Sequence, residues 1–224
     1  MGGRLVLVPT PIGDLEDIVL RALSVLREAD RVAAEDTRHT GRLLAHYEIK
    51  KPMMSFHEHN EARQSAKILE LLEAGETLAL VSDAGTPGIS DPGFRAVRAA
   101  REAGHAVEVL PGPTALIPAL VASGLPSDRF VFEGFLPRKP GARRRLFEAL
   151  AGEKRSVLYY ESPHRIARAV AELAELHPER PVALVREISK LHEEVLRGSA
   201  AELAARLAER PVKGELVLVV GPPA

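Results

Sequence analysis

The 224-residue sequence predicts an α/β fold with two α/β domains, and three observations support this prediction. Short runs of aliphatic residues, typical of buried strands, alternate with longer segments whose apolar residues recur three and four positions apart, as in amphipathic helices. Glycine and proline stand at the junctions between these segments. The hydrophobic fraction of 46% is enough to bury a core in each domain.

In the first half, strands are expected at residues 4–8, 32–35, 77–81 and 106–110. They are expected to pair largely in parallel, because helical segments connect them. Asp14 is a candidate cap for a helix over 15–30, and Asn60 for a helix that stops at Gly75. Two more helices are expected, one after the acidic stretch at 35–36 and one over 94–104.

A domain boundary is predicted at the sequence PGP (111–113), which interrupts the repeating pattern. The two domains are therefore expected at 1–112 and 113–224. The second begins with an apolar helix at 114–124, followed by strands at 129–135, 156–161, 181–187, 193–198 and 215–221. Helices are expected from residue 141, over 163–176 and before the last strand, and the sheet is expected to be mixed.

Composition limits the chemistry and the location. The chain has no cysteine, which excludes disulfides, thiolate metal sites and a cysteine nucleophile. No apolar run reaches the roughly 20 residues of a membrane span, and the first residues lead directly into a strand, so a cytoplasmic protein is expected. The net charge is −1, but residues 1–112 carry 13 basic and 17 acidic residues, whereas the remainder carries 17 and 14. The second half is thus the basic one.

Three stretches rich in glycine and proline follow predicted strands: PTPIGD (9–14), SDAGTPGISDPG (82–93) and PGPTA (111–115). Each alone could be a tight turn or a helix cap. In open α/β sheets, however, ligands bind outside the carboxyl ends of strands, where loops after neighbouring parallel strands converge. Together the three stretches predict a cradle for a ligand.

The cradle lacks the common nucleotide-binding patterns. No two glycines in the chain stand two positions apart, so G-x-G-x-x-G is missing, and so is the P-loop pattern G-x-x-x-x-G-K-[ST]. Asp83 and Asp91 disfavour a bare phosphate, whereas S-adenosylmethionine, with a sulfonium, an ammonium and a ribose diol, suits these loops better. A magnesium ion on the two aspartates is the competing interpretation. His57 and His59 could form a metal pair, but no third ligand is evident.

A second polar stretch, AAEDTRHTGRLL (33–44), places Glu35, Asp36 and His39 after a predicted strand. Part of it has a structural explanation, since Asp36 or the threonine after it can cap a helix, and Arg38 can pair with Glu35. The alternative is a polar wall of an active site, completed by SFHEHNEAR (55–63).

The second half contains its own polar candidates. FLPRKPGARRR (135–145) places five cations within eight residues; backbone phosphates require such clusters, although a solvated helix start is the commoner explanation. YYESPHRIA (159–167) offers Glu161 and Arg165, and Ser162 can cap a helix that starts at the following proline. VREISKLHEEVLRG (185–198) supplies Lys190, with surface solvation as the default explanation.

Seven segments in this order strongly resemble the ribosomal RNA small-subunit methyltransferase I family of the tetrapyrrole methylase superfamily: LVLVPTPIGDLEDI, AAEDTRHTGRLL, LVSDAGTPGISDPG, VLPGPTALIPALVASGLP, FEGFLPRK, YYESPHRI and the KLHEE region. The resemblance runs from about residue 4 to 221, and the combination is highly specific. Many family members continue into a small C-terminal extension, whereas this chain stops after VLVVGPPA. If that extension helps to dock RNA, the arginine cluster and the dimer carry more of that task here.

The resemblance implies two α/β domains of the tetrapyrrole methylase type with the cofactor cleft between them, usually in a homodimer. It also implies S-adenosylmethionine-dependent methylation of the ribose 2′-hydroxyl of a cytidine in small-subunit (16S) ribosomal RNA, free or assembled in the subunit. A porphyrinogen or precorrin methyltransferase shares the fold, but the arginine cluster fits it poorly. A noncatalytic RNA-binding assembly factor is the alternative of a different class, and it has no need of the cradle.

The expected site residues form three groups. Candidates for the catalytic base or an orienting group are Glu35, Asp36, His39, Glu161 and Lys190. Expected contacts of the cofactor are Pro11, Asp83, Gly85, Pro87, Ile89, Ser90, Thr114 and Ala115. Expected contacts of the RNA are Arg38, Arg138, Lys139, Arg143, Arg144, Arg145 and Arg165. No metal is expected.

Overall fold

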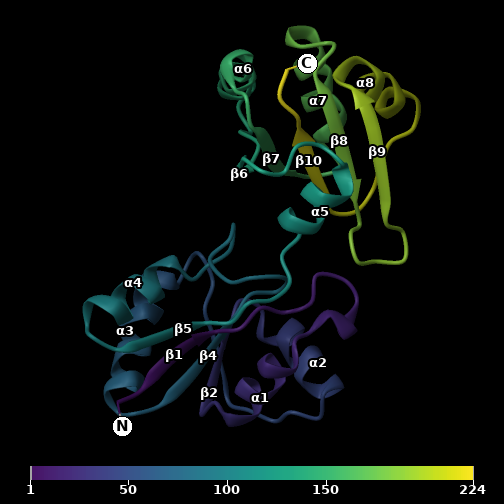
Figure 1. The fold of residues 1–224 in the computed structure, drawn as a ribbon. Coiled ribbons are helices and arrows are strands. Elements are labelled where there is room, and N and C mark those ends of the chain that lie inside the picture. Colours follow the sequence, from purple (N-terminus) through teal and green to yellow (C-terminus); the bar gives the residue numbers. More distant parts are fainter. Residues whose placement is uncertain (1, 224) are drawn as a thin grey trace. The chain divides into compact units, whose positions relative to one another are not determined.

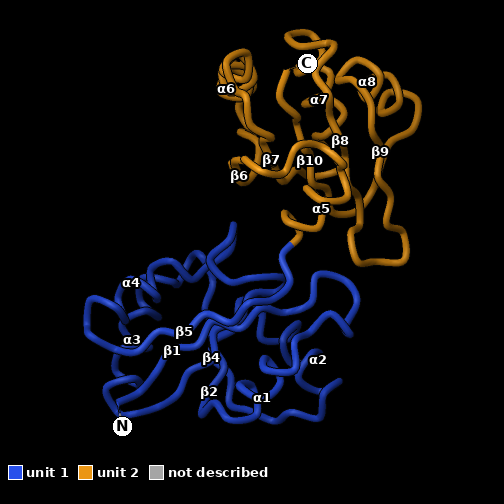
Figure 2. Tube along the Cα trace, in the orientation of Figure 1, with its two compact units in different colours: residues 1–114 blue, residues 115–224 orange. Residues whose placement is uncertain are grey.

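The chain folds into two compact units, Met1–Thr114 and Ala115–Ala224, in a computed structural model that describes residues 2–223. Figure 2 colours the two units. Each unit contains one five-stranded sheet covered by helices (Figure 1), in agreement with the predicted α/β class. No helix in the described range is both long and apolar enough to cross a lipid bilayer.

The first unit is built on an entirely parallel sheet with the strand order β3-β2-β4-β1-β5. Its strands are β1 (Arg4–Leu7), β2 (Arg31–Ala34), β3 (Met53–Ser55), β4 (Thr77–Val81) and β5 (Ala106–Val109). The helices that connect them are α1 (Leu20–Glu28), α2 (Thr37–His46), α3 (Glu61–Glu73) and α4 (Phe94–Glu102). Because β4, β1 and β5 are neighbours, the loops that follow these three strands leave the sheet at the same edge.

The three inner strands of this sheet, β1, β2 and β4, are buried on both faces, which explains their continuous apolar sequences. Val6 and Val8 of the first strand segment pack with α1 and α2, while Leu5 and Leu7 pack with α3 and α4. All four side chains are at most 4% exposed. Successive side chains of this segment thus point to opposite faces of the sheet and pack with the helices on each face.

Two elements of the first unit differ from expectation. The helix expected over 15–30 is split into a 3₁₀ turn, Leu15–Asp17, capped by Asp14, and the shorter α1. Between them Ile18 and Val19 are extended, with ψ of 132° and 141°, because these β-branched residues favour extended backbone and Ile18 is buried in the core. The short edge strand β3 was not predicted, since it has only three residues and its Met53 is 37% exposed.

The second unit has the mixed sheet that the sequence predicts, with the order β6-β7-β10-β8-β9. Its strands are β6 (Phe130–Phe135), β7 (Ser156–Glu161), β8 (Pro181–Arg186), β9 (Glu194–Ser199) and β10 (Leu216–Val220). Only the pair β6 and β7 is parallel. Its helices are α5 (Leu116–Ser123), α6 (Pro140–Ala149), the 3₁₀ turn Leu150–Gly152, α7 (Ile166–Leu176) and α8 (Ala200–Glu209).

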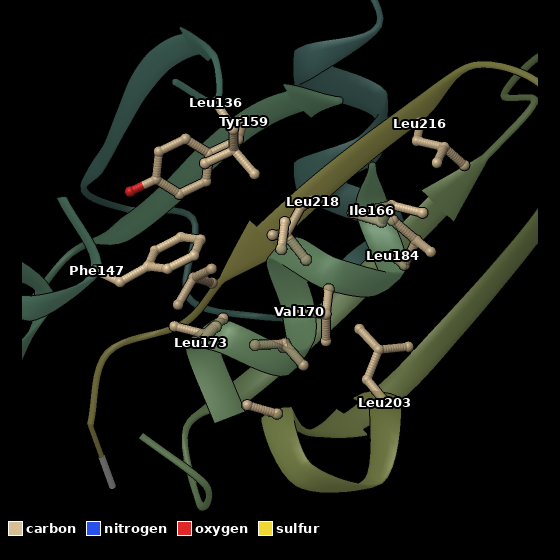
Figure 3. Packing of buried hydrophobic residues seen from close by; sticks show 14 of the residues in the cluster. Leu136, Phe147, Tyr159, Ile166, Val170, Leu173, Leu184, Leu203, Leu216 and Leu218 are labelled. Atoms are coloured by element: carbon tan, nitrogen blue, oxygen red, sulfur yellow. The ribbon is translucent and has the colours of Figure 1, made fainter. Parts of the chain in front are cut away.

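Two clusters of buried side chains fill the second unit on either side of its sheet. On one face Phe147, Leu173 and Leu203 from the three C-terminal helices pack on alternate strand residues such as Tyr159 and Leu218 (Figure 3). On the other face α5 packs on the remaining strand residues. The central strand β10 is completely buried, which makes it the centre of this unit.

Leu218 provides a test of how far the second unit depends on β10. Its side chain is 0% exposed, so truncation to alanine removes buried contacts and leaves a cavity. We expect Leu218→Ala to lower the free energy of unfolding by about 2–5 kcal/mol in denaturant titrations. The control is Leu191→Ala, the same chemical change at a residue that is 93% exposed, which should shift stability by less than about 0.5 kcal/mol. Equal effects of the two variants would contradict the packing.

Candidate functional site

The three predicted loops of the first unit touch one another. Thr10, after β1, and Gly85, after β4, exchange two backbone hydrogen bonds, each with an N···O distance of 3.0 Å. The Thr86 hydroxyl donates to the Pro113 carbonyl, after β5, at 2.9 Å. The Thr10 hydroxyl donates to the Ser82 carbonyl at 3.2 Å. The strand-end segments therefore form one continuous structure, as the cradle prediction required.

Two glycines allow these loops to approach closely. Gly85 has a φ of +80°, and a Cβ atom there would lie 3.4 Å from Ile12 and 3.7 Å from the Pro113 carbonyl. A Cβ atom on Gly112 would lie only 2.6 Å from Pro9, so only glycine fits without a shift of one loop. The missing side chains of these two glycines therefore let the loop residues Ile12 and Pro9 pack directly on the backbone of the neighbouring loops.

The long loop 82–93 is held at its far end by α3. Glu61, near the start of α3, accepts hydrogen bonds from the backbone N–H groups of Gly93 and Arg95, both at 3.1 Å, and so caps α4. Gly93 and Gly88 lie against each other, and Ser90 adopts a φ of +62°. A serine in the left-handed region is uncommon, and such residues concentrate at functional sites. No local sequence pattern indicates this role of Glu61.

The structure places the predicted cofactor contacts along this edge. Asp83 and Thr114 are partly buried, and Pro11, Gly85 and Pro87 are buried. Ile89 and Ser90 are exposed. Thr114 is the last residue of the first unit and Ala115 precedes α5.

Carboxylates gather where β2 and β4 end. The backbone N–H of Asp36 donates to Asp83 Oδ1 at 3.0 Å, and the backbone N–H of Asp83 lies 3.4 Å from Glu35 Oε2. Burial, with the neighbouring charge of Asp83, raises the pKa of Glu35 above its ordinary value. Burial, followed by the charge of Glu35, also raises the pKa of Asp91 to about 6. These groups form an acidic wall where β2 and β4 end.

Asp36 has a structural task. Its carboxylate caps α2 by accepting from the backbone N–H groups of Arg38, at 2.8 Å, and His39, at 3.4 Å. The Arg38 side chain pairs with the same carboxylate at 3.2 Å, so the expected pair between Arg38 and Glu35 is wrong. Hydrogen bonds from Arg38 lower the pKa of Asp36 to about 2. His39 and Arg38 are exposed on the first turn of α2.

His57 and His59 follow β3, but they do not belong to a metal centre in the part of the chain that the structure describes. There, no group of three or more histidine, aspartate or glutamate side chains is arranged to hold an ion. Asn60 stands at the N-cap position of α3, as predicted, yet its side chain does not cap the helix. It turns back instead to Ser55 and His57.

In the second unit, Glu161 ends β7 and is 3% exposed. Its Oε1 accepts from the Ser162 backbone N–H at 2.6 Å and pairs with the Arg165 guanidinium. Glu161 Oε2 and Arg165 Nη1 are buried, and neither has a hydrogen-bond partner among residues 2–223. The predicted cap is wrong here: α7 begins at Ile166, and Arg165 rather than Ser162 precedes it.

Lys190 lies in the turn between β8 and β9. Its ammonium contacts Glu187 Oε1 and Glu215 Oε2, both at 3.1 Å. Burial disfavours the charged ammonium and would lower the pKa of Lys190, but the hydrogen bonds to the two carboxylates outweigh burial and raise this pKa. The side chain is therefore held as a cation.

The basic segment after β6 divides into buried and exposed cations. Arg143 is a correction to the expected RNA contacts: it is 3% exposed, and its guanidinium donates to Glu172 at 2.7 and 2.8 Å and to the Pro137 carbonyl. It lies one helical turn before Phe147, on the face of α6 that packs into the core. Arg144 pairs with Glu148 and Glu175 on the surface, whereas the exposed residues of the segment include Arg138, Lys139 and Arg145.

The fold and the cradle define a class of methyltransferases, and comparison with known proteins agrees. Residues 4–204 match the family of tetrapyrrole (corrin/porphyrin) methylases. A solved uroporphyrin-III-C-methyltransferase from Thermus thermophilus superposes with a TM-score of 0.68 at 28% identity, covering 98% of this chain and 94% of that one. A solved structure described as uroporphyrin-III C-methyl transferase from Thermus thermophilus complexed with S-adenyl homocysteine superposes with a TM-score of 0.67 at 23% identity, covering 98% of this chain and 97% of that one.

Sequence relatives narrow the class. A protein of Xylella fastidiosa named ribosomal RNA small subunit methyltransferase I is 52% identical to this chain, and the alignment covers 97% of this chain and 81% of the relative. A protein of the same name from Thermotoga maritima is 45% identical, and the alignment covers 97% of this chain and 98% of the relative. The chain belongs to the ribosomal RNA small subunit methyltransferase I family of the tetrapyrrole methylases.

The raised pKa of Asp91 predicts a specific dependence of stability on pH. Because its folded-state pKa is about 6 and an unfolded aspartate titrates near about 4, the neutral carboxyl stabilises the fold below about pH 4, and this contribution is lost as the pH rises through about 6. Asp91→Asn cannot ionise. We expect its melting temperature to match wild type near pH 4 and to exceed it increasingly up to about pH 7, by differential scanning calorimetry. A difference that does not change with pH would contradict the assignment.

Proposed function

We propose that the protein transfers a methyl group from S-adenosylmethionine to the ribose 2′-hydroxyl of a cytidine in small-subunit ribosomal RNA. The observation that carries this proposal is the 45–52% identity, over 97% of the chain, to relatives named for methylation of that RNA. The identity to the uroporphyrin methyltransferase is lower, at 28%. The tetrapyrrole alternative is therefore the less favoured one.

The cradle suits S-adenosylmethionine chemically. Its acidic wall of Glu35, Asp83 and Asp91 favours a ligand with a sulfonium and an ammonium group, and the glycine-shaped backbone offers N–H and C=O groups to a nucleoside. When bound, this compound supplies a methyl group that its positive sulfur activates for transfer. The residues proposed to hold it are Pro11, Asp83, Gly85, Pro87, Ile89, Ser90, Thr114 and Ala115.

Glu35 is the best candidate for the general base. A ribose hydroxyl is a weak nucleophile and must lose its proton as the new O–CH₃ bond forms. Burial raises the pKa of Glu35 toward the working pH, which favours proton acceptance. One carboxylate oxygen has only a long contact, at 3.4 Å, with the backbone N–H of Asp83, so the carboxylate can turn and one of its oxygens can take the hydroxyl proton. Alignment of the hydroxyl with the methyl donor supplies the remainder of the rate enhancement.

The other catalytic candidates are proposed to orient groups. Asp36 fixes the first turn of α2 and thereby places His39. Lys190, held as a cation by two carboxylates, stabilises negative charge and is a poor proton acceptor. Glu161 holds Arg165 through their ion pair.

Exposed cations are proposed to contact the RNA backbone. Arg138, Lys139 and Arg145 are exposed around the start of α6, and Arg144 and Arg38 carry only surface ion pairs, which contribute little. Arg165 adds a guanidinium at the start of α7. We also infer that the protein acts in the cytoplasm, as a homodimer, which the family resemblance suggests.

A side-by-side assay tests the proposed activity. The purified protein is supplied with methyl-labelled S-adenosylmethionine and with naked small-subunit ribosomal RNA, the assembled subunit or a porphyrinogen. We expect label in the RNA of one of the first two samples, located by mass spectrometry on a cytidine ribose. Label found only in the porphyrinogen would overturn the proposal. The absence of label in every sample, combined with the absence of S-adenosylmethionine binding, would also overturn it.

Asp83 tests the cofactor site. Asp83→Ala removes both the negative charge and the acceptor for the Asp36 N–H, so we expect binding of S-adenosylmethionine to weaken about tenfold or more in isothermal titration calorimetry. Asp83→Asn keeps the acceptor oxygen and removes only the charge. An intermediate affinity is expected for it, and unchanged affinity in both variants would defeat the assignment.

Glu35 tests the base. Glu35→Gln keeps the shape and an acceptor for the Asp83 N–H but cannot take a proton, so we expect methyl transfer to slow by about 10²–10⁴-fold. Binding of S-adenosylmethionine, measured by calorimetry, should weaken no more than in Asp83→Asn, which also removes one charge of the acidic wall. Full methyl transfer by the glutamine variant would exclude Glu35 as the base.

A further inference from the structure

His57 and the proposed base, Glu35, follow neighbouring strands of the parallel sheet. Strands β2 and β3 are neighbours in parallel register, with Ala34 opposite Ser55. The pairing continues one step further, where the Phe56 N–H donates to the Ala34 carbonyl at 2.8 Å. Glu35 and His57 therefore leave the same edge of the sheet on adjacent strands.

The orientation of the Asn60 side chain is fixed by two backbone groups. Its Oδ1 accepts from the His57 backbone N–H at 2.9 Å, and its Nδ2 lies 3.3 Å from the Ser55 carbonyl, which can only accept. In a flipped amide, the nitrogen would face the His57 N–H, donor against donor, and the oxygen would face the Ser55 carbonyl, acceptor against acceptor. The amide nitrogen must therefore be the atom that faces the imidazole of His57.

This orientation determines where the imidazole carries its proton. Asn60 Nδ2 lies 3.1 Å from His57 Nε2, so Nε2 accepts and the neutral ring is protonated on Nδ1. His57 Nδ1 is buried and has no hydrogen-bond partner in the chain from residue 2 to 223. A buried donor without an acceptor is rare in native proteins and requires an explanation.

We propose that His57 is a positioning residue for Glu35: its Nδ1–H, directed by Asn60, is the donor that the Glu35 carboxylate accepts when substrate occupies the site. The inference rests on the proposed function, in which Glu35 takes the hydroxyl proton. The present contact of Glu35 Oε2 with the Asp83 N–H is long, at 3.4 Å, so a side-chain rotation is inexpensive. One carboxylate oxygen then accepts from His57 and the other faces the ribose hydroxyl.

The charges around Glu35 agree with this role. Burial raises the pKa of Glu35, the backbone N–H of Asp83 lowers it, and the charges of Asp83 and Glu58 raise it. Among the neighbouring side chains in this balance, His57 is the one that lowers the pKa of Glu35. It thereby keeps the base ionised in surroundings that are otherwise acidic.

Two substitutions separate this role from a purely structural one. The amide nitrogen of asparagine can occupy the place of histidine Nδ1, whereas the amide of glutamine reaches the place of Nε2. His57→Asn thus keeps the donor toward Glu35, and His57→Gln keeps the contact with Asn60. If His57 only anchors Asn60, glutamine is the better replacement.

We expect His57→Asn to stay within about threefold of the wild-type kcat and His57→Gln to lose about tenfold or more, with the KM for RNA unchanged in both. In the glutamine variant the acidic limb of the kcat profile should move to higher pH, because loss of the donor leaves Glu35 harder to ionise. Circular dichroism and calorimetric binding of S-adenosylmethionine establish that both variants fold. Equal activity of the two variants, or the reverse order, would overturn the proposal.

A second measurement does not depend on activity. Nitrogen-15 NMR of imidazole-labelled protein, with His57→Asn to assign the signal, should show His57 protonated on Nδ1 in the free enzyme. Protonation on Nε2 would overturn the inference while leaving the proposed methyl transfer intact. Conversely, full activity of Glu35→Gln would remove the proposed base without changing this NMR result.

Discussion

The pair of backbone hydrogen bonds between Thr10 and Gly85 is the constraint on which the candidate site depends. Strands β1 and β4 run in parallel up to this point, and then their loops join in a single antiparallel bridge. At this bridge Gly85 has a positive φ, which glycine adopts without strain. Since Thr86 next binds the carbonyl of Pro113, the same bridge fixes the third loop as well. The cradle is therefore rigid through its main chain, and its side chains remain available for a ligand.

Burial of acidic groups at the rim of this cradle sets its preference for a ligand. Glu35 and Asp91 both have raised pKa values, because desolvation and mutual repulsion disfavour two charges at this edge. A cationic ligand relieves both effects, whereas an anionic one adds to the repulsion. Under the proposed function, the burial that favours a cationic ligand at this edge also raises the pKa of the proposed base, Glu35.

The sequence predicted those parts of the molecule that depend on local patterns. The α/β class, four of the parallel strands and the junction of three loops followed from apolar periodicity and from glycine and proline at strand ends. The break at Ile18 was missed because helical periodicity continues across it, and β3 because three half-exposed residues carry little signal. Contacts between distant segments, such as Glu61 with Gly93, leave no local pattern, since they depend on how α3 and α4 pack. The tautomer of His57 is of the same kind: it depends on a side chain that the sequence assigned to capping.

The basic segment of the second unit shows how composition overestimates a binding surface. Five cations between residues 138 and 145 suggest a continuous phosphate contact, yet Arg143 precedes Phe147 by four residues and Leu150 by seven, which is the spacing of a buried helical stripe. Its guanidinium donates hydrogen bonds to Glu172 and to a backbone carbonyl, and removing the Glu172 carboxylate would leave the buried charge of Arg143 unpaired. The cation of Arg143 therefore stabilises the packing of α6 on α7 and is unavailable to RNA. With fewer free cations, nonspecific attraction to the RNA backbone is modest and easily screened by salt. Under the proposed function, discrimination of the target nucleotide then comes from contacts at the site itself, where a single ribose hydroxyl meets the proposed base.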